Sequence, residues 1–159
     1  MKGRFKYRIY PTPGQKYRLA KLFGCVRVVW NDSLACCQQK YKSGEKKPTN
    51  TELQKQFITS SKKTEEREWL SEVSAIPLQQ SLNDLNQAYQ NFFASTKGQR
   101  KGKPIKPPRF KKRKSKQTAR FTKGGFKVGQ HKVYLAKIGK LKIVSPVRVT
   151  RCSIISNSN

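Results

Sequence analysis

The residues of this chain best able to do chemistry are cations, and they cluster at residues 106–121. This stretch reads KPPRFKKRKSKQTARF and holds eight lysines and arginines, two prolines, two phenylalanines and no acid. Ammonium and guanidinium groups in such number bind phosphate oxygens and displace the counterions of nucleic acid. Taken alone, the stretch is open to three interpretations: a disordered basic tail, a localisation signal, or a clamp on nucleic acid. We favour the clamp, because prolines and phenylalanines interrupt the run and structure is expected on both sides of it.

The charge of the whole chain points to the same kind of partner. Its 159 residues carry a formal net charge of +28, and such a chain repels itself unless a polyanion neutralises it. The eight acids are confined to Asp32–Glu72 and Asp84, whereas residues 85–159 contain twenty lysines and arginines and no acid. Nucleic acid is the expected partner. No long apolar run or dominant basic amphipathic helix indicates a membrane.

Groups suited to catalysis or metal binding are scarce. Hydrolysis by two metals needs several converging carboxylates, but the acids here are expected to cap helices or to balance cations on solvated faces. The single histidine, His131, has no carboxylate partner in its sequence neighbourhood, and the four cysteines form no Cys-x-x-Cys pair. This pattern indicates buried or free thiols in a reducing, intracellular setting. We expect no catalytic residue, metal site or cofactor in this chain.

The first half of the chain predicts one strand followed by helices. Residues 4–9 alternate apolar and cationic side chains, as a half-buried strand does. Residues 15–42 have a helical apolar period, within which Gly24 either separates two helices or kinks one. Capping signals at Thr49 and Thr64 predict two shorter helices, and Pro77 begins the clearest helix.

The second half predicts strands. After a loop at residues 97–117 the apolar period falls to two, and five short strands are expected around Ala119/Phe121, Phe126/Val128, Val133/Leu135, Leu141/Ile143 and Val147/Val149. A lone N-terminal strand needs sheet partners, which only this half supplies. The predicted fold class is therefore α+β: a small split β-barrel of the oligonucleotide-binding type, with a helical bundle inserted after the first strand. The expected organisation is a first strand at 1–10, a helical module at 11–96, a basic loop at 97–117, the remaining barrel at 118–150 and a polar tail at 151–159.

Several short motifs, taken in order, resemble one family. They are RIYPTP at 8–13, FGCVRVVWN at 23–31, WLSEV at 69–73, LQQSLNDL at 78–85, AYQNFF at 88–93, PRFKK at 108–112 and LAKIGKLKI at 135–143. Their combination over residues 4–144 resembles TnpB/OrfB, the insertion-sequence proteins long called transposases.

The resemblance implies an architecture and an activity. In that family a wedge (WED) β-barrel is split by a helical recognition (REC) module, and the early helices have been described as a helix-turn-helix. Together these parts hold a guide RNA made from the transposon end and read a short motif beside the DNA target. Cutting belongs to a RuvC domain with an Asp, Glu, Asp site for Mg²⁺, which is accompanied by a zinc ribbon for Zn²⁺. We expect this chain to end before both, as a truncated transposon copy or a frameshifted reading frame with a short polar end.

The resemblance also suggests site residues. Those expected to read the target-adjacent DNA motif are Gln79, Thr122 and Lys123, with Asn50 and Thr51 as further candidates. Residues expected to bind the nucleic-acid backbone are Arg4, Lys6, Arg8, Lys16, Arg27, Arg109, Lys111, Lys112, Arg113 and Lys114. Phe110 and Phe121 either anchor the loop in a core or stack on bases, and we favour the anchoring role for both.

Three functional hypotheses follow. The first is a nucleic-acid-binding fragment of a TnpB-like RNA-guided endonuclease that binds guide RNA and double-stranded DNA without cutting. The second is a stand-alone regulator that uses the early helices as a helix-turn-helix. The third is a non-specific basic RNA-binding protein. In each case we expect a cytoplasmic, nucleoid-associated protein of prokaryotic type.

Overall fold

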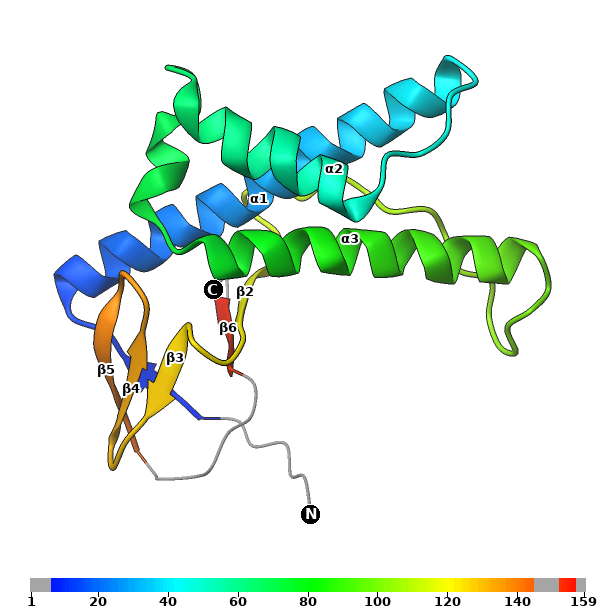
Figure 1. The fold of residues 1–159 in the computed structure, drawn as a ribbon. Coiled ribbons are helices and arrows are strands. Elements are labelled where there is room, and N and C mark those ends of the chain that lie inside the picture. The colour runs from blue at the N-terminus through cyan, green and yellow to red at the C-terminus, as the bar shows by residue number, and fades with distance from the viewer. Residues whose placement is uncertain (1–6, 145–151, 157–159) are drawn as a thin grey trace.

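The computed structural model describes residues 7–144 and the backbone of residues 152–156. In chain order it has a short strand, a helical region, a long basic segment and a group of strands (Figure 1). The principal elements are β1 (Ile9–Tyr10), α1 (Pro13–Lys42), α2 (Asn50–Gln54), α3 (Ala75–Thr96), β2 (Gln117–Phe121), β3 (Phe126–Val128), β4 (Lys132–Leu135), β5 (Gly139–Ile143) and β6 (Cys152–Ser156).

The helix α1 is a single uninterrupted helix of 30 residues. It begins at a capping box, in which the side chains of Thr12 and Gln15 each accept a bond from the other's backbone N–H. It ends at a Schellman motif, where Gly44 adopts a φ of 71° that favours glycine. Gly24 neither divides the helix nor breaks its hydrogen bonds, because the apolar stripe continues on both sides of it.

The region between α1 and α3 is helical but irregular. The predicted capping box at Thr49 and Glu52 is confirmed and opens α2, which continues into a π-helical stretch, η1 (Lys55–Ser60), and a short 3₁₀ helix, η2 (Ser61–Lys63). The helix predicted to start at Thr64 is wrong: Thr64 ends η2, and only the 3₁₀ helix η3 (Glu68–Glu72) follows. The segment is too short for a longer helix, because its eleven residues from Thr64 to Ser74 must also return the chain to the start of α3.

The helix α3 confirms the clearest sequence prediction, although it begins two residues before Pro77 with Ser74 as its N-cap. Its seam of Leu78, Leu82 and Leu85 is fully buried. It packs along α1, with α2 and η1 lying over the pair (Figure 1). One hydrophobic core joins these helices to the inner faces of the strands.

The strands form two separate antiparallel sheets. One has four strands in the order β1-β5-β4-β3, and the other pairs β2 with β6. Strand β1 therefore takes its partner from the C-terminal half, as its unpaired edge required, with Ile9 opposite Ile143. The chain is α+β, but the split barrel with an inserted bundle is not confirmed, because the described strands form an open sheet and a separate ribbon.

Most of the predicted strands occur where alternation indicated them, at β2, β3, β4 and β5. The pair Val147/Val149 lies outside the described residues. The segment expected to be a polar tail instead contributes β6, which pairs with β2 from Gln117↔Ser156 to Phe121↔Cys152. Its CSIIS sequence includes two adjacent isoleucines, and β-branched residues favour strands over coil.

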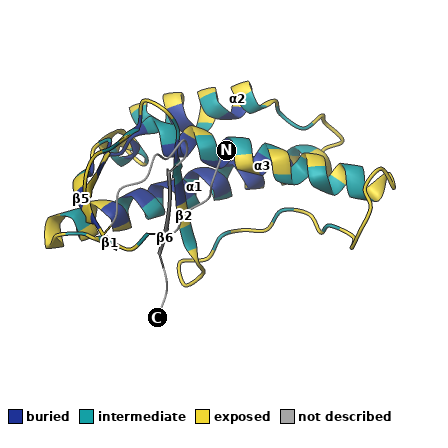
Figure 2. Cartoon of the chain, turned by 90° about the horizontal axis from the view of Figure 1, so that it is seen from below, coloured by how far each residue is buried: buried dark blue, intermediate teal, exposed yellow. Residues whose placement is uncertain are grey.

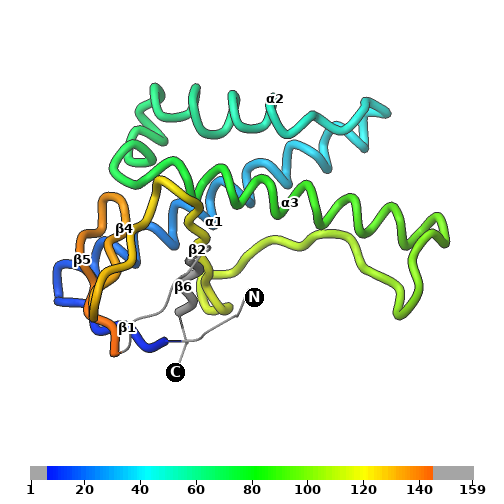
Figure 3. Tube along the Cα trace, turned by 60° about the horizontal axis from the view of Figure 1, so that its bottom comes forward, coloured from blue at the N-terminus to red at the C-terminus, as the bar shows by residue number. Residues whose placement is uncertain are grey.

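The basic segment at 97–116 has no regular secondary structure, as predicted. It leaves α3 through a second Schellman motif at Gly98 and turns back alongside the helices toward β2 (Figure 3). Most of its residues are exposed along this path (Figure 2). The predicted loop is therefore a return strap that follows the helical layer.

Candidate nucleic-acid interface

The basic segment is fastened to α1 by a clasp of side chains on consecutive helical residues. The Trp30 indole donates from Nε1 to the carbonyl oxygen of Arg109, at 3.0 Å. The Asn31 amide bonds the backbone of Lys111 twice: Oδ1 accepts from its N–H at 2.8 Å, and Nδ2 donates to its carbonyl at 3.0 Å. The amide thus substitutes for a neighbouring strand, and it holds this part of the segment extended against the helix.

The Lys111 side chain points inward rather than toward solvent. Its ammonium lies 4.1 Å from the centroid of the Trp30 ring, a cation–π distance. Burial lowers the pKa of Lys111, and the charge of Asp84 on α3 opposes that shift. Asp84 also pairs with Arg120 of β2, Oδ1 to a guanidinium nitrogen at 2.6 Å. Lys111 and Arg120 therefore connect the segment, both long helices and β2.

Just beyond the clasp, the chain makes a turn that displays three cations. Ser115 bonds back to the Lys112 carbonyl through both its N–H and its hydroxyl. The Gln117 amide donates to the same carbonyl at 2.9 Å and to that of Ser115 at 2.8 Å. Lys112, Arg113 and Lys114 are exposed on this turn, which we call the cationic turn. Because the backbone is held on both sides, the cations are presented from an ordered loop.

The two phenylalanines of the run have different roles. Phe121 is fully buried and closes β2 onto the core, as predicted. Phe110 is 50% exposed, so the prediction that it anchors the segment in a core is wrong. Anchoring is done by Trp30 and Asn31, and this leaves the Phe110 ring accessible between Arg109 and Lys111.

The two elements that carry the predicted DNA-reading residues, the start of α3 and the turn after β2, meet where β2 ends. Thr122 and Lys123 begin a turn closed by a bond from the Gly125 N–H to the Thr122 carbonyl. A Cβ on Gly125 would lie 2.9 Å from Cδ1 of Ile76, so this turn is pressed against the first turn of α3. Gln79 follows Ile76 by three residues and is exposed. The structure therefore places the turn of Thr122 and Lys123 against the start of α3, the helix that carries Gln79. We call this junction the corner.

The cationic turn and this corner lie at the two ends of β2. Five strand residues separate them, which corresponds to roughly 17 Å of extended chain. Both flank the same strand, so one nucleic-acid segment of a few nucleotides is long enough to contact both.

The weaker candidates Asn50 and Thr51 begin α2, close to α3. The Asn50 amide donates from Nδ2 to Oδ1 of Asn83 at 2.5 Å, one helical turn beyond Gln79. Its Oδ1 is buried without a hydrogen-bond partner. Thr51 is exposed. Asn50 therefore lies beside the corner, but its amide is engaged within the protein, whereas Thr51 is accessible.

The remaining predicted backbone contacts are dispersed. Arg4 and Lys6 lie outside the described residues. Arg8 precedes β1 and Lys16 lies in the first turns of α1, both exposed, whereas Arg27 is half-buried midway along α1. None of these three belongs to the cationic turn or to the corner at the end of β2.

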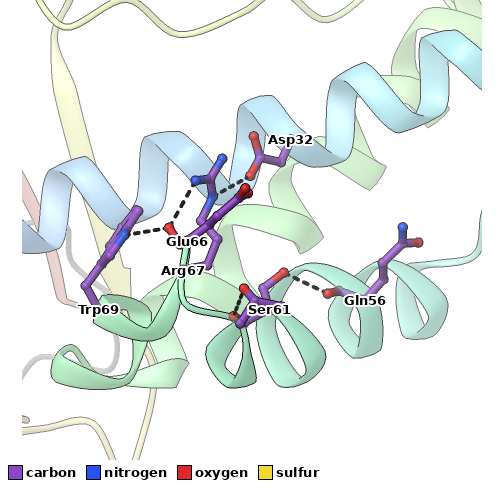
Figure 4. Close-up of polar contacts among 7 residues, drawn as sticks. Asp32, Gln56, Ser61, Glu66, Arg67 and Trp69 are labelled. Carbon is purple, nitrogen blue, oxygen red and sulfur yellow. Dashed lines mark hydrogen bonds and ion pairs between the residues drawn. The ribbon is translucent and has the colours of Figure 1, made fainter.

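The acids serve local structural roles. Arg67 pairs with Asp32 of α1 at 3.2 Å, and the Glu66 carbonyl accepts bonds from Arg67 and from the Trp69 indole (Figure 4). Glu72 pairs with Lys21, and the bonds from Thr49 lower the pKa of Glu52. Within residues 7–144 no three His, Cys, Asp or Glu side chains are grouped so that they could hold a metal ion.

The thiols are those of a packed core where the structure describes them. Cys25 and Cys37 are buried and unpaired. Burial raises the pKa of Cys25 to about 11 and also raises that of Cys37. None of the helices among the described residues is long and apolar enough to span a membrane.

Known proteins with similar sequences indicate which family this chain resembles. Residues 1–46 match the helix-turn-helix domain of the OrfB proteins of IS605 elements. A Streptomyces pristinaespiralis protein named "Putative RNA-guided DNA endonuclease" is 41% identical over 138 residues, which are 86% of this chain and 32% of that protein. The chain belongs to the OrfB/TnpB family. InsQ of Escherichia coli K12, which bears the same description, is 30% identical over 148 residues, 92% of this chain and 34% of its own length.

These OrfB/TnpB relatives are about three times as long as the part of them that this chain matches. The matched helix-turn-helix region has an unexpected form here. Between Pro13 and Lys42 the structure has one continuous helix, with no turn between two helices. The region is therefore a strand followed by one long helix. The middle of α1, at Trp30 and Asn31, contacts the basic segment.

Sequence reasoning missed three residues of this interface: Trp30, Asn31 and Arg120. The signal for the first two was present in the motif FGCVRVVWN, where an aromatic and an amide follow an otherwise apolar helical stripe. Their partners are 79 and 80 residues away in the chain, and no local pattern predicts a contact at that separation.

Proposed function

We propose that this chain is the nucleic-acid-binding N-terminal region of an OrfB/TnpB-type RNA-guided DNA endonuclease. It grips a structured guide RNA and contacts double-stranded target DNA, and it does not cut DNA by itself. The observation that carries this proposal is the cationic turn, held on α1 by the Trp30–Asn31 clasp and set along β2 from the corner of Gln79 and Thr122. The names of the relatives and the net charge of +28 support the same reading.

The division of labour between the two ends of β2 follows from their chemistry. Arginine and lysine contact phosphates, which gives affinity without sequence information. A glutamine amide can form two hydrogen bonds with adenine, and a threonine methyl can contact the methyl group of thymine. We therefore assign backbone grip to the cationic turn and sequence preference to Gln79, Thr122 and Lys123.

The test is a binding titration over a range of salt concentrations. The ligands are RNA transcribed from the transposon end, unrelated RNA of equal length, and duplex DNA. We expect the transposon-end RNA to bind most tightly and to tolerate salt best, because shape-specific contacts add to the ionic ones. Equal binding of both RNAs at every salt concentration would favour a non-specific basic RNA-binding protein instead.

Two further measurements define the limits of the proposal. Gln79→Ala and Thr122→Ala should change the preference among duplexes of different sequence, with little loss of affinity for a pool of random duplexes. Incubation of the chain with guide RNA, target DNA and magnesium should leave the DNA intact. Guide-directed cutting by this chain alone would show that the assignment as a binding region is wrong.

A further inference from the structure

The solvent face of the four-stranded sheet carries a regular pattern of lysine and tyrosine. Side chains alternate along each strand, and the inward set is apolar: Val133, Leu135, Leu141 and Ile143 are buried. The outward set consists of Tyr10 on β1, Lys127 on β3, Lys132 and Tyr134 on β4, and Lys140 and Lys142 on β5, all of which are exposed. We call this face the Lys/Tyr face.

The strand register arranges these six side chains in two rows. In one row Tyr10 lies opposite Lys142, which lies opposite Lys132. In the other row Tyr134 lies between Lys140 and Lys127. Each row thus crosses three strands and contains one aromatic ring and two ammonium groups, and neither row contains an acid.

This pattern is unfavourable for the isolated protein. Directly opposed lysines repel each other across a sheet, as Lys132 and Lys142 must. The tyrosine rings, 48% exposed at Tyr10 and 39% at Tyr134, also leave apolar surface in water. A ligand that is both polyanionic and flat-ringed removes both costs, because its phosphates neutralise the lysines and its rings cover the tyrosines.

The surface has room for such a ligand. A shallow hollow of about 730 Å³ lies over Tyr134, bordered by Lys127, His131, Lys132 and Lys140. A hollow of that size falls within the roughly 300–1,000 Å³ of ordinary small-ligand sites. It suits a base stacked on Tyr134 with its phosphate near the flanking lysines.

We propose that the Lys/Tyr face is a stacking platform for unpaired nucleotides. Tyr10 and Tyr134 stack on successive or nearby bases, and the four lysines contact the backbone. The rows select single strands, because the bases of a duplex have no free face to offer a protein side chain. The platform is separate from the cationic turn, and it rests on the proposed function only in taking nucleic acid as its ligand.

The experiment uses the whole chain and short fluorescein-labelled oligonucleotides of about ten residues, the length scale of such sites. Fluorescence anisotropy would compare oligouridylate, oligothymidylate and a blunt duplex of equal length. Replacing Tyr10 and Tyr134 together by alanine should weaken single-strand binding by about fivefold to a hundredfold for each stacked base. The slope of affinity against salt should stay unchanged, because no charge is lost.

Control variants separate stacking from general damage. Tyr41→Ala removes a tyrosine that is 84% exposed in the last turn of α1 and should bind like the wild type. Tyr10→Phe with Tyr134→Phe should retain affinity, and Tyr10→Leu with Tyr134→Leu, which keeps an apolar side chain but removes the ring, should lose it. If the alanine variant does not fold, the comparison of the phenylalanine and leucine double variants still tests whether the rings stack on bases.

The outcomes are distinct. Tyrosine-dependent binding of both single strands supports the platform for RNA and DNA alike, and dependence for oligouridylate only assigns it to RNA. Unchanged single-strand affinity in the alanine and leucine variants, or a stronger effect on the duplex, overturns the inference. If replacing Lys112, Arg113 and Lys114 by alanine weakens binding while the tyrosine variants do not, the proposed function stands and the platform fails. If the chain binds no nucleic acid, both are refuted.

Discussion

Replacing Asn31 by alanine should release the basic segment from α1. The change removes both hydrogen bonds that Asn31 makes to the backbone of Lys111. At about 1 kcal/mol net for each bond, the loss is about 2 kcal/mol. Alanine has a higher helix propensity than asparagine, and this offsets roughly 0.5 kcal/mol. The expected destabilisation is therefore about 1.5 kcal/mol, which for a chain of this length lowers Tm by roughly 3–6 °C.

Thermal unfolding followed by circular dichroism measures this effect, and limited trypsin digestion reports the segment directly. Cleavage after Arg109 and Lys112 should become faster in Asn31→Ala, because the extended backbone is no longer held. Asn91→Ala is the matched control: Asn91 is also a half-buried helical asparagine, and its amide bonds only Gln87 one turn earlier. If both variants melt and digest alike, the clasp does not hold the segment and our reading of it is wrong.

Three other predictions concern neighbouring parts of the structure. Asp84→Asn should lower stability by about 1 kcal/mol, since its half-exposed ion pair with Arg120 is lost. The variant should also bind nucleic acid more strongly. A weakened affinity would contradict the role given to Asp84 beside Arg120 and Lys111. Gly125→Ala should destabilise the fold by about 1–2 kcal/mol because its Cβ meets Cδ1 of Ile76, and Ile76→Val in the same chain should restore part of the loss in a double-mutant cycle. Burial raises the pKa of Cys25 from 9.0 to about 11. The contribution of its neutral thiol to stability is therefore complete below pH 9 and is lost as the pH rises toward 11. In Cys25→Ala the free energy of unfolding in urea should fall less over that pH interval, and an identical decline in the variant would refute the assignment.

Local patterns predicted the elements that rest on local physics. The buried seam of α3, the capping box at Thr49 and the alternating strands β2 to β5 all occur where the sequence placed them. Each depends on residues within one or two turns, or within one strand. The sequence also predicted that an N-terminal strand would pair with the C-terminal half, and β1 does so. The strand was expected at residues 4–9, but among the described residues it covers only Ile9–Tyr10.

What the sequence did not predict depends on long-range contacts. Phe110 was expected to anchor the basic segment, but a ring within a polar run gives no indication of which surface it meets. The anchor is formed by Trp30 and Asn31 of α1, which are about 80 residues away from the segment in the sequence. The described strands form an open sheet rather than a closed barrel, because β2 pairs with β6 and not with a strand of the four-stranded sheet.

The resemblance placed Gln79, Thr122 and Lys123 at one site, and the structure sets the turn of Thr122 and Lys123 against the helix that carries Gln79. Their contacts with DNA stay a prediction, as do the phosphate contacts of Arg109, Lys112, Arg113 and Lys114. Lys111 was grouped with these cations by sequence alone. Its ammonium faces the Trp30 ring, so it is better placed to fix the segment than to bind phosphate.

The central claim is that the cationic turn grips nucleic acid through its phosphates. The most direct test is the salt dependence of duplex binding for a variant with alanine at Lys112, Arg113 and Lys114. Removing three phosphate contacts should weaken binding and reduce the slope of log affinity against log salt by about 2–3. A control variant with alanine at Lys42, Lys46 and Lys55, exposed and remote along the chain, loses the same charge and should retain most of the slope. Equal slopes and affinities for the two variants would contradict the account.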